Sequence, residues 1–267
     1  MCPIRSGGMM GHTILGNLPK SQKWSVVMSL LQSPEVDARS VSQATVRAAE
    51  RRLIGLRGDP SLTYCFWLLT RLASAARNEN FAGDLDRLGI SVQPRDGMLA
   101  LLSQVSDRTR QELSGFPESG PFSDIAATAL RTSLVETVGT QNLTLFGSSV
   151  DDLAGAFRRH STAAQFGELA TRFFGAFYAR TLRFYIDRAL PSSIGGGGLV
   201  TFTDAEQFRT ALDRHAMESA RIVERFAGEW YIKHHLAADG RISRDDAQAF
   251  TAHALRKLRS ELLVDVV

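Results

Sequence analysis

The sequence predicts an all-α protein, a multi-helix bundle of about eight to ten helices around one long apolar helix at about 161–190. Apolar residues recur at helical spacing in most segments, and strand-like patterns are few. The segment 161–190 is apolar around almost its whole circumference, which is typical of a helix buried in a core. With 267 residues and 44% hydrophobic residues, the chain is long enough to bury a large core.

The long helix has recognisable ends and one polar strip. Thr162 with Gln165 three residues later is a capping-box pattern, and Pro191 ends the helix. A ridge of small residues at a spacing of four allows another helix backbone to approach closely; it consists of Gly167, Thr171, Gly175 and Ala179. The polar strip carries three arginines, Arg172, Arg180 and Arg183. Because these charges interrupt the apolar run, we expect no membrane span.

Turn residues divide the first half of the chain into helices. Breaks are expected at 33–34, at 58–60 and around Pro94. The helices expected between them cover 21–33, about 37–57, 61–78, a short stretch within 80–97, and 97–113. Residues 1–20 are rich in glycine and methionine and show no periodicity, which predicts a flexible N-terminal lead.

A loop rich in glycine and proline at 114–123 separates these helices from the second group. Further helices are expected at 123–138, 150–160, 204–238 and from 243 to about 263. Thr203 with Glu206 and Ser243 with Asp246 are capping-box patterns. An apolar stripe on 204–238 that includes Trp230 predicts an antiparallel hairpin with the last helix, turning at Gly240. We expect an N-terminal lobe over 21–115 and a C-terminal core over 123–267, or one continuous domain.

The known patterns for cofactors, metals and catalysis are missing or incomplete. Glycines 195–198 lack the lysine of a phosphate-binding P-loop, so a flexible surface loop is expected there. Residues 235–246 imitate a calcium loop, but His235 and Ala237 stand where oxygen ligands are needed. His215 lies near an apolar stripe and is interpreted as a core histidine. Cys65 lies among aromatic residues and is interpreted as buried. We therefore assign no catalytic residue, no cofactor and no metal site.

The basic residues suggest where an anion binds. The net charge is +3, and only four of the 31 basic residues are lysine, which leaves 27 arginines. Arginine favours bidentate pairing with carboxylate or phosphate. The candidate anion or nucleic-acid contacts are Arg47, Arg51 and Arg52 on the basic segment 39–57, and Arg172, Arg180 and Arg183 on the long helix. The alternative for the long helix is a solvated strip that pairs with acidic residues of neighbouring helices.

The first helix is the candidate partner surface. Residues 21–33 form a short apolar helix that must dock on something, since so short a helix is marginal alone. Trp24, Val27, Met28 and Leu31 would contact another chain, because Trp and Met are enriched at interface centres. The alternative is docking on the protein's own core.

These patterns favour a non-enzymatic interaction or assembly subunit of a cytoplasmic multi-protein complex, with a protein partner or a second copy of the chain. Cytoplasmic residence is expected because the N-terminus lacks the apolar stretch of a signal peptide. One alternative is a nucleic-acid-binding accessory protein that uses the arginine-rich helices. Another is an enzyme whose site is assembled from scattered residues.

Overall fold

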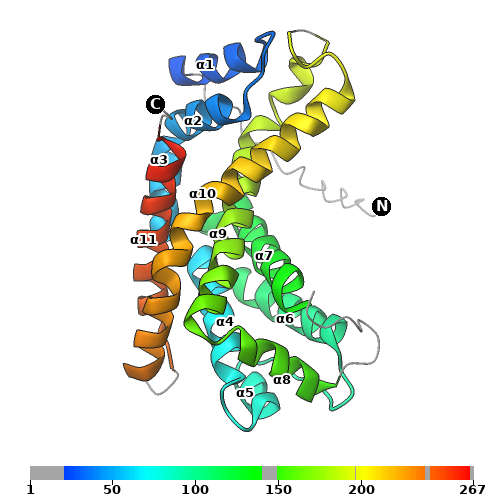
Figure 1. Ribbon diagram of the computed structural model, residues 1–267, viewed down its shortest axis with the longest axis vertical. Coiled ribbons are helices and arrows are strands. Elements are labelled where there is room, and N and C mark those ends of the chain that lie inside the picture. Colours follow the sequence, from blue (N-terminus) through cyan, green and yellow to red (C-terminus); the bar gives the residue numbers. More distant parts are fainter. Residues whose placement is uncertain (1–20, 140–148, 196, 238–240, 265–267) are drawn as a thin grey trace, which may run out of the picture.

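The computed structural model describes residues 21–139, 149–195, 197–237 and 241–264, and this part of the chain is all-α (Figure 1). Within it lie eleven α-helices and no β-strand, which confirms the predicted fold class. None of the described helices is long and apolar enough to cross a membrane. The predicted flexible lead over 1–20 and the predicted turn at Gly240 lie outside the described residues.

The helices follow the predicted order with few differences. They are α1 Gln22–Leu31, α2 Ala38–Ala48, α3 Glu50–Gly55, α4 Pro60–Ala75, α5 Phe81–Arg87, α6 Met98–Leu113, α7 Pro121–Leu134, α8 Val150–Arg159, α9 Ala163–Ile186, α10 Phe202–Ala237 and α11 Arg244–Leu262. Short turns of helix are η1 Leu56–Gly58, η2 Pro117–Ser119, η3 Val135–Gly139 and η4 Leu190–Ser192. Eleven helices are found instead of eight to ten partly because Ala49, at ψ 8°, divides the segment expected at 37–57 into α2 and α3.

Helix α9 lies at the centre and packs closely against α10. The phenylalanines of α9 at 166, 173, 174 and 177 are fully buried. Gly167 lies against the backbone of Glu224, and Gly228 lies so close to Ala163 that an added Cβ would overlap its carbonyl oxygen. These contacts make the two helices antiparallel. They confirm that the small-residue ridge of α9 admits another helix backbone.

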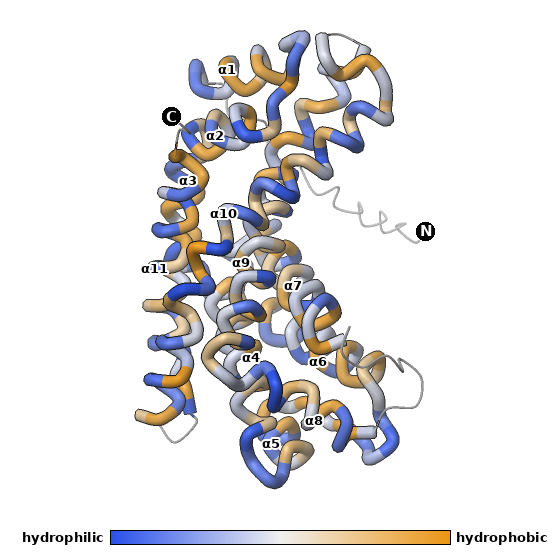
Figure 2. The backbone as a smooth tube through the Cα atoms, viewed as in Figure 1, coloured by the Kyte–Doolittle hydropathy of each residue, from blue (hydrophilic) through white to orange (hydrophobic). Residues whose placement is uncertain are grey.

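An aromatic cluster joins α9 and α10 to α4 and α11. The ring of Phe66 on α4 lies 5.2 Å from Phe174 on α9, 5.7 Å from Trp230 on α10 and 4.8 Å from Phe250 on α11, between ring centroids. Trp230 is partly buried, and its ring lies 4.4 Å from that of Phe250, as the predicted α10–α11 hairpin requires. Hydrophobic and hydrophilic residues interleave along the helices around α9 (Figure 2), in keeping with one buried face on an outer helix.

One hydrophobic cluster includes side chains from both sides of the 114–123 loop. It contains Leu62 and Leu101 from the predicted N-terminal lobe, and Phe173 and Leu258 from the predicted C-terminal core. The two lobes are therefore in contact through apolar side chains. The division of the chain into two domains at this loop stays a prediction.

Two of the three predicted caps are confirmed and one is wrong. The Thr162 hydroxyl accepts from the Gln165 amide at 3.4 Å, and Ser243 forms a complete capping box with Asp246. The box expected at Thr203 and Glu206 lies two residues earlier, where the Asp204 carboxylate accepts from the Thr201 amide at 2.7 Å and the Thr201 hydroxyl accepts from the Asp204 amide at 3.1 Å. An aspartate completes the box as a glutamate does, so α10 starts earlier than predicted.

The glycine loop is more closely packed than the sequence indicates. It lies at the surface, as expected, but Gly197 and Gly198 contact the connection between α1 and α2. The amide of Gly198 donates to the carbonyl of Ser33 at 2.7 Å, and a Cβ on Gly197 would overlap the carbonyl oxygen of Gln32. Gly197 also has a positive φ of 60°. These glycines allow two backbones to meet.

Candidate functional site

The three arginines predicted on the long helix lie in one cleft. Its volume is about 360 Å³; α9 forms its floor, and α7 with η3 and α10 form its walls. The lining residues are Thr132, Glu136, Arg172, Ala176, Ala179, Arg180, Arg183, Asp213, Arg214 and Met217. The predicted strip of arginines is therefore recessed between neighbouring helices.

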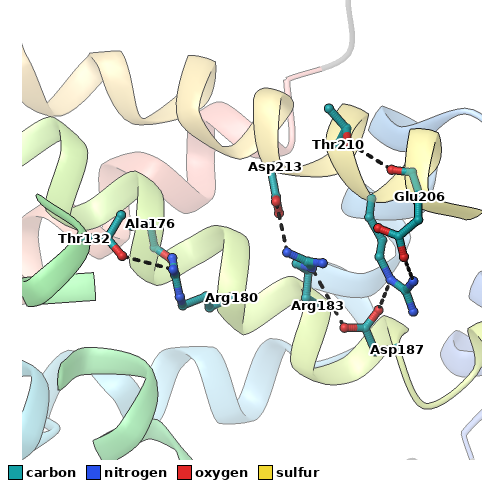
Figure 3. A network of polar contacts seen from close by, with 9 residues as sticks. Thr132, Ala176, Arg180, Arg183, Asp187, Glu206, Thr210 and Asp213 are labelled. Atoms are coloured by element: carbon teal, nitrogen blue, oxygen red, sulfur yellow. Dashed lines mark hydrogen bonds and ion pairs between the residues drawn. The ribbon is translucent and has the colours of Figure 1, made fainter. Parts of the chain in front are cut away.

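Arg180 is half-buried in this cleft and has only neutral hydrogen-bond partners. Its guanidinium donates to the Thr132 hydroxyl at 3.0 Å and to the Ala176 carbonyl at 3.4 Å (Figure 3). Within the described ranges, no carboxylate lies within ion-pair distance of it. Burial lowers the pKa of Arg180, while the nearby carboxylates of Asp213 and Glu136 act in the opposite direction. Arg180 is thus a partly desolvated cation whose nearby carboxylates lie beyond ion-pair distance.

Arg183 belongs to an ion-pair network instead. It donates to Asp213 on α10 at 3.1 Å and lies 3.9 Å from Asp187. Asp187 in turn accepts from Arg209 on α10 at 2.8 Å, and Arg209 also pairs with Glu206 (Figure 3). Burial raises the pKa of Asp213, although Arg183 and Arg180 act to lower it. For Arg183, the alternative of pairing with acidic residues of a neighbouring helix is realised.

The two ends of the cleft differ in charge. At one end Arg172 faces Glu136 at 3.7 Å, and both side chains are about half exposed. At the other end Arg180, Arg183 and Arg214 have Asp213 alone as an acidic neighbour in the lining. Arg214 is exposed and has no partner among the residues that the structure describes. Four arginines against two carboxylates leave a net charge of +2, and this surplus lies at the second end.

The arginines predicted on 39–57 form a separate surface. Arg47, Arg51 and Arg52 are all exposed, on α2 and α3. Arg47 and Arg51 line a shallow depression with Lys23, Glu50 and others, and this depression shares no lining residue with the cleft. Arg52 lies with its guanidinium carbon 5.0 Å from the ring centroid of Phe122. The two groups of arginines predicted as anion contacts are therefore not brought together.

The residues predicted as a partner surface face inward. Trp24, Val27 and Leu31 are buried, and Met28 is partly buried against the same hydrophobic cluster. This is the arrangement expected if α1 docks on its own chain. Val26 is the large apolar residue that α1 exposes, at 53% of its surface. A role of Trp24, Val27, Met28 and Leu31 in partner binding stays a prediction.

Sequence reasoning missed the residues of α7, η3 and α10 that complete the cleft, namely Thr132, Glu136, Asp213, Arg214 and Met217. A partial signal exists on α10, where Arg209, Asp213 and Met217 follow at a spacing of four and so share one helix face. The sequence does not tell which face of α10 meets α9.

The remaining cysteine and histidine candidates do not line the arginine cleft. Cys65 is buried, as predicted, and burial raises the pKa of its thiol. His215 is half-buried on α10, and burial lowers the pKa of its imidazole. No group of three or more His, Cys, Asp or Glu side chains is placed to hold a metal ion within the part of the chain that the structure describes.

Comparisons with protein-family models, with curated proteins and with solved structures gave no match to this chain. The arginine cleft is therefore interpreted from its own geometry. Its guanidinium groups are of a kind that offers charge-assisted hydrogen bonds to a carboxylate or a phosphate.

Proposed function

We propose that this protein is a non-enzymatic helical subunit of a cytoplasmic multi-protein complex, and that the arginine cleft binds an acidic group of a partner protein. The observation that carries the proposal is Arg180, a half-buried guanidinium with neutral partners in a cleft of net charge +2. A partly desolvated cation is unfavourable without a counter-charge, and an incoming anion relieves this cost.

The residues around Arg180 suit the binding of a ligand better than the catalysis of a reaction. The ionisable groups that line the cleft are arginines and two carboxylates, which suit anion binding and provide no activated nucleophile. Charged groups at a binding surface mainly provide specificity and fast association. The partner's acidic group would therefore select the partner, while other contacts add to the affinity.

Co-purification from native cells tests this proposal. Wild-type protein should recover a partner that is lost with Arg180→Gln and with Arg214→Gln. Arg225→Gln is the matched control, because Arg225 is an exposed arginine of α10 about 16 Å further along the helix than Arg214. The recovered complex should also weaken as salt rises. Retention of every partner by both cleft variants would contradict the proposal.

A second candidate function is nucleic-acid binding by the surface of α1–α3. It is favoured by the exposed depression that Lys23, Arg47 and Arg51 line together with Glu50, which pairs with Lys23. Such an exposed basic surface suits contact with phosphates of a nucleic-acid backbone.

Filter binding of duplex DNA and of RNA across a range of salt concentrations tests the second candidate. Lys23→Gln and Arg51→Gln should each reduce the slope of log affinity against log salt by about one unit for a duplex. The cleft variants should leave that slope unchanged. No retention of either nucleic acid at low salt would exclude the candidate.

A further inference from the structure

We propose that the acidic group taken by the arginine cleft is a phosphate monoester on a side chain of the partner protein. This inference rests on the proposed function and adds the chemical class of the ligand. Three features of the cleft carry it: where its positive charge lies, which N–H groups remain available, and how large it is.

The surplus charge is concentrated at one end of the cleft. The charge of Arg172 is offset by Glu136, and Arg183 pairs with both Asp213 and Asp187. Arg180 and Arg214 have no carboxylate within ion-pair distance in the part of the chain that the structure describes. A partner segment with several separate carboxylates would be matched by cations spread along the whole cleft. A phosphate monoester instead places a charge of about −1.5 to −2 on one compact group. The local surplus of two positive charges matches that group.

Hydrogen-bond donors are also available at this end. A guanidinium has five N–H groups in a planar fork, and Arg180 makes two hydrogen bonds, to Thr132 and Ala176. Arg214 is exposed and makes no hydrogen bond to any residue that the structure describes. Because a phosphate offers three strong acceptor oxygens, it can accept from more than one of these arginines at once.

The size and lining of the cleft suit a phosphorylated side chain. A volume of about 360 Å³ is at the lower end of the range for ligand sites, which is enough for a phosphoryl group and the side chain that carries it. Ala176, Ala179 and Met217 form an apolar part of the lining, against which the carbon atoms of that side chain would lie.

Calorimetric titration of the full chain with acetylated and amidated phosphoserine tests the inference. We expect saturable binding at least tenfold tighter than that of the equivalent aspartate compound, and no binding of the unphosphorylated serine compound. Arg180→Gln and Arg214→Gln should each weaken binding of the phosphoserine compound at least tenfold, while Arg225→Gln should leave it unchanged. Because Arg214 is exposed, its substitution keeps the test valid even where Arg180→Gln disturbs the fold.

Two outcomes would overturn the inference. Equal binding of the phosphoserine and aspartate compounds would assign the cleft to carboxylates and leave the proposed function standing. Binding of inorganic phosphate without binding of the phosphoserine compound would assign it to a free small anion. Failure of the proposed function gives a different result, since the partner recovered from cells would then be retained by both cleft variants.

Discussion

The arginines of α9 and those of α2–α3 look alike in the sequence but have different environments in the structure. Arg180 and Arg183 are recessed between α7 and α10, where burial lowers the pKa of Arg180 and a carboxylate pairs with Arg183. Arg47 and Arg51 lie at an exposed depression. The difference teaches that the function of an arginine depends on what the neighbouring helices place beside it. A recessed guanidinium interacts with an anion in a lower dielectric than an exposed guanidinium does, so the same ion pair is stronger there.

The largest expected effect concerns the approach of α10 to α9, on which the recessed environment depends. Gly228→Ala places a Cβ against the carbonyl oxygen of Ala163. We expect a loss of about 2–3 kcal/mol in the free energy of unfolding, as for overpacking of a core. Chemical denaturation measures it.

Gly155→Ala on α8 is the control for this substitution, because no atom lies within 4 Å of the added Cβ. It should stabilise the protein by about 0.5–1 kcal/mol through helix propensity. If both substitutions stabilise to the same extent, α9 and α10 do not meet as closely as described, and the cleft loses one wall.

The next effect compares the loss of stability when an arginine is replaced by methionine on α9 and on α3. Arg183→Met removes the partner of Asp213, whose pKa is already raised by burial, and leaves that carboxylate less well compensated. Because both side chains are partly exposed, we expect a loss of about 1 kcal/mol, which is at the upper end for a solvated ion pair. Arg51→Met on α3 should change stability by less than about 0.5 kcal/mol. Equal losses in urea denaturation at pH 7 would remove the distinction between the regions.

A smaller effect concerns the pKa of a buried histidine near the start of α9. His160 is fully buried at the end of α8, and burial lowers the pKa of its imidazole below the ordinary value of 6.5. The stability contributed by the neutral ring is present above pH 6.5 and is lost as the pH falls through the lower folded-state pKa. Wild-type protein should therefore lose more of its thermal stability between pH 7 and pH 5 than His160→Leu. The same loss in both proteins would show that His160 titrates normally.

The sequence predicted the parts of this fold that depend on local pattern. The period of apolar residues located α9 and α10. The ridge around Gly167 and Gly175 indicated where another helix packs, and the structure shows that this helix is α10. The box at Ser243 located the start of α11, whereas α10 begins earlier than predicted because Asp204, and not Glu206, is the acidic partner in its box. Helical spacing could be read from one segment at a time, so these elements required no knowledge of neighbours.

The candidate site was predicted only in part, because its walls come from other helices. Arg180 and Arg183 were identified as one polar strip, yet their partners Thr132 and Asp213 lie 48 and 30 residues away in the chain. The inward orientation of Trp24 on α1 also depends on tertiary packing. Which face of a helix meets which neighbour is decided by the whole core, so a local pattern cannot distinguish a recessed arginine from an exposed one.

The contact between Gly198 and Ser33 has an evolutionary consequence. A surface loop ordinarily tolerates insertions and replacements, so its sequence drifts among descendants of one ancestor. Here positions 197 and 198 have little freedom, since a methyl group at either would collide with the backbone of residues 32–34. Lineages that share this fold should therefore keep two adjacent glycines and a fixed loop length, together with the bend at Pro34. That paired signature, separated by more than 160 residues, would mark a distant relative even where the helices have diverged.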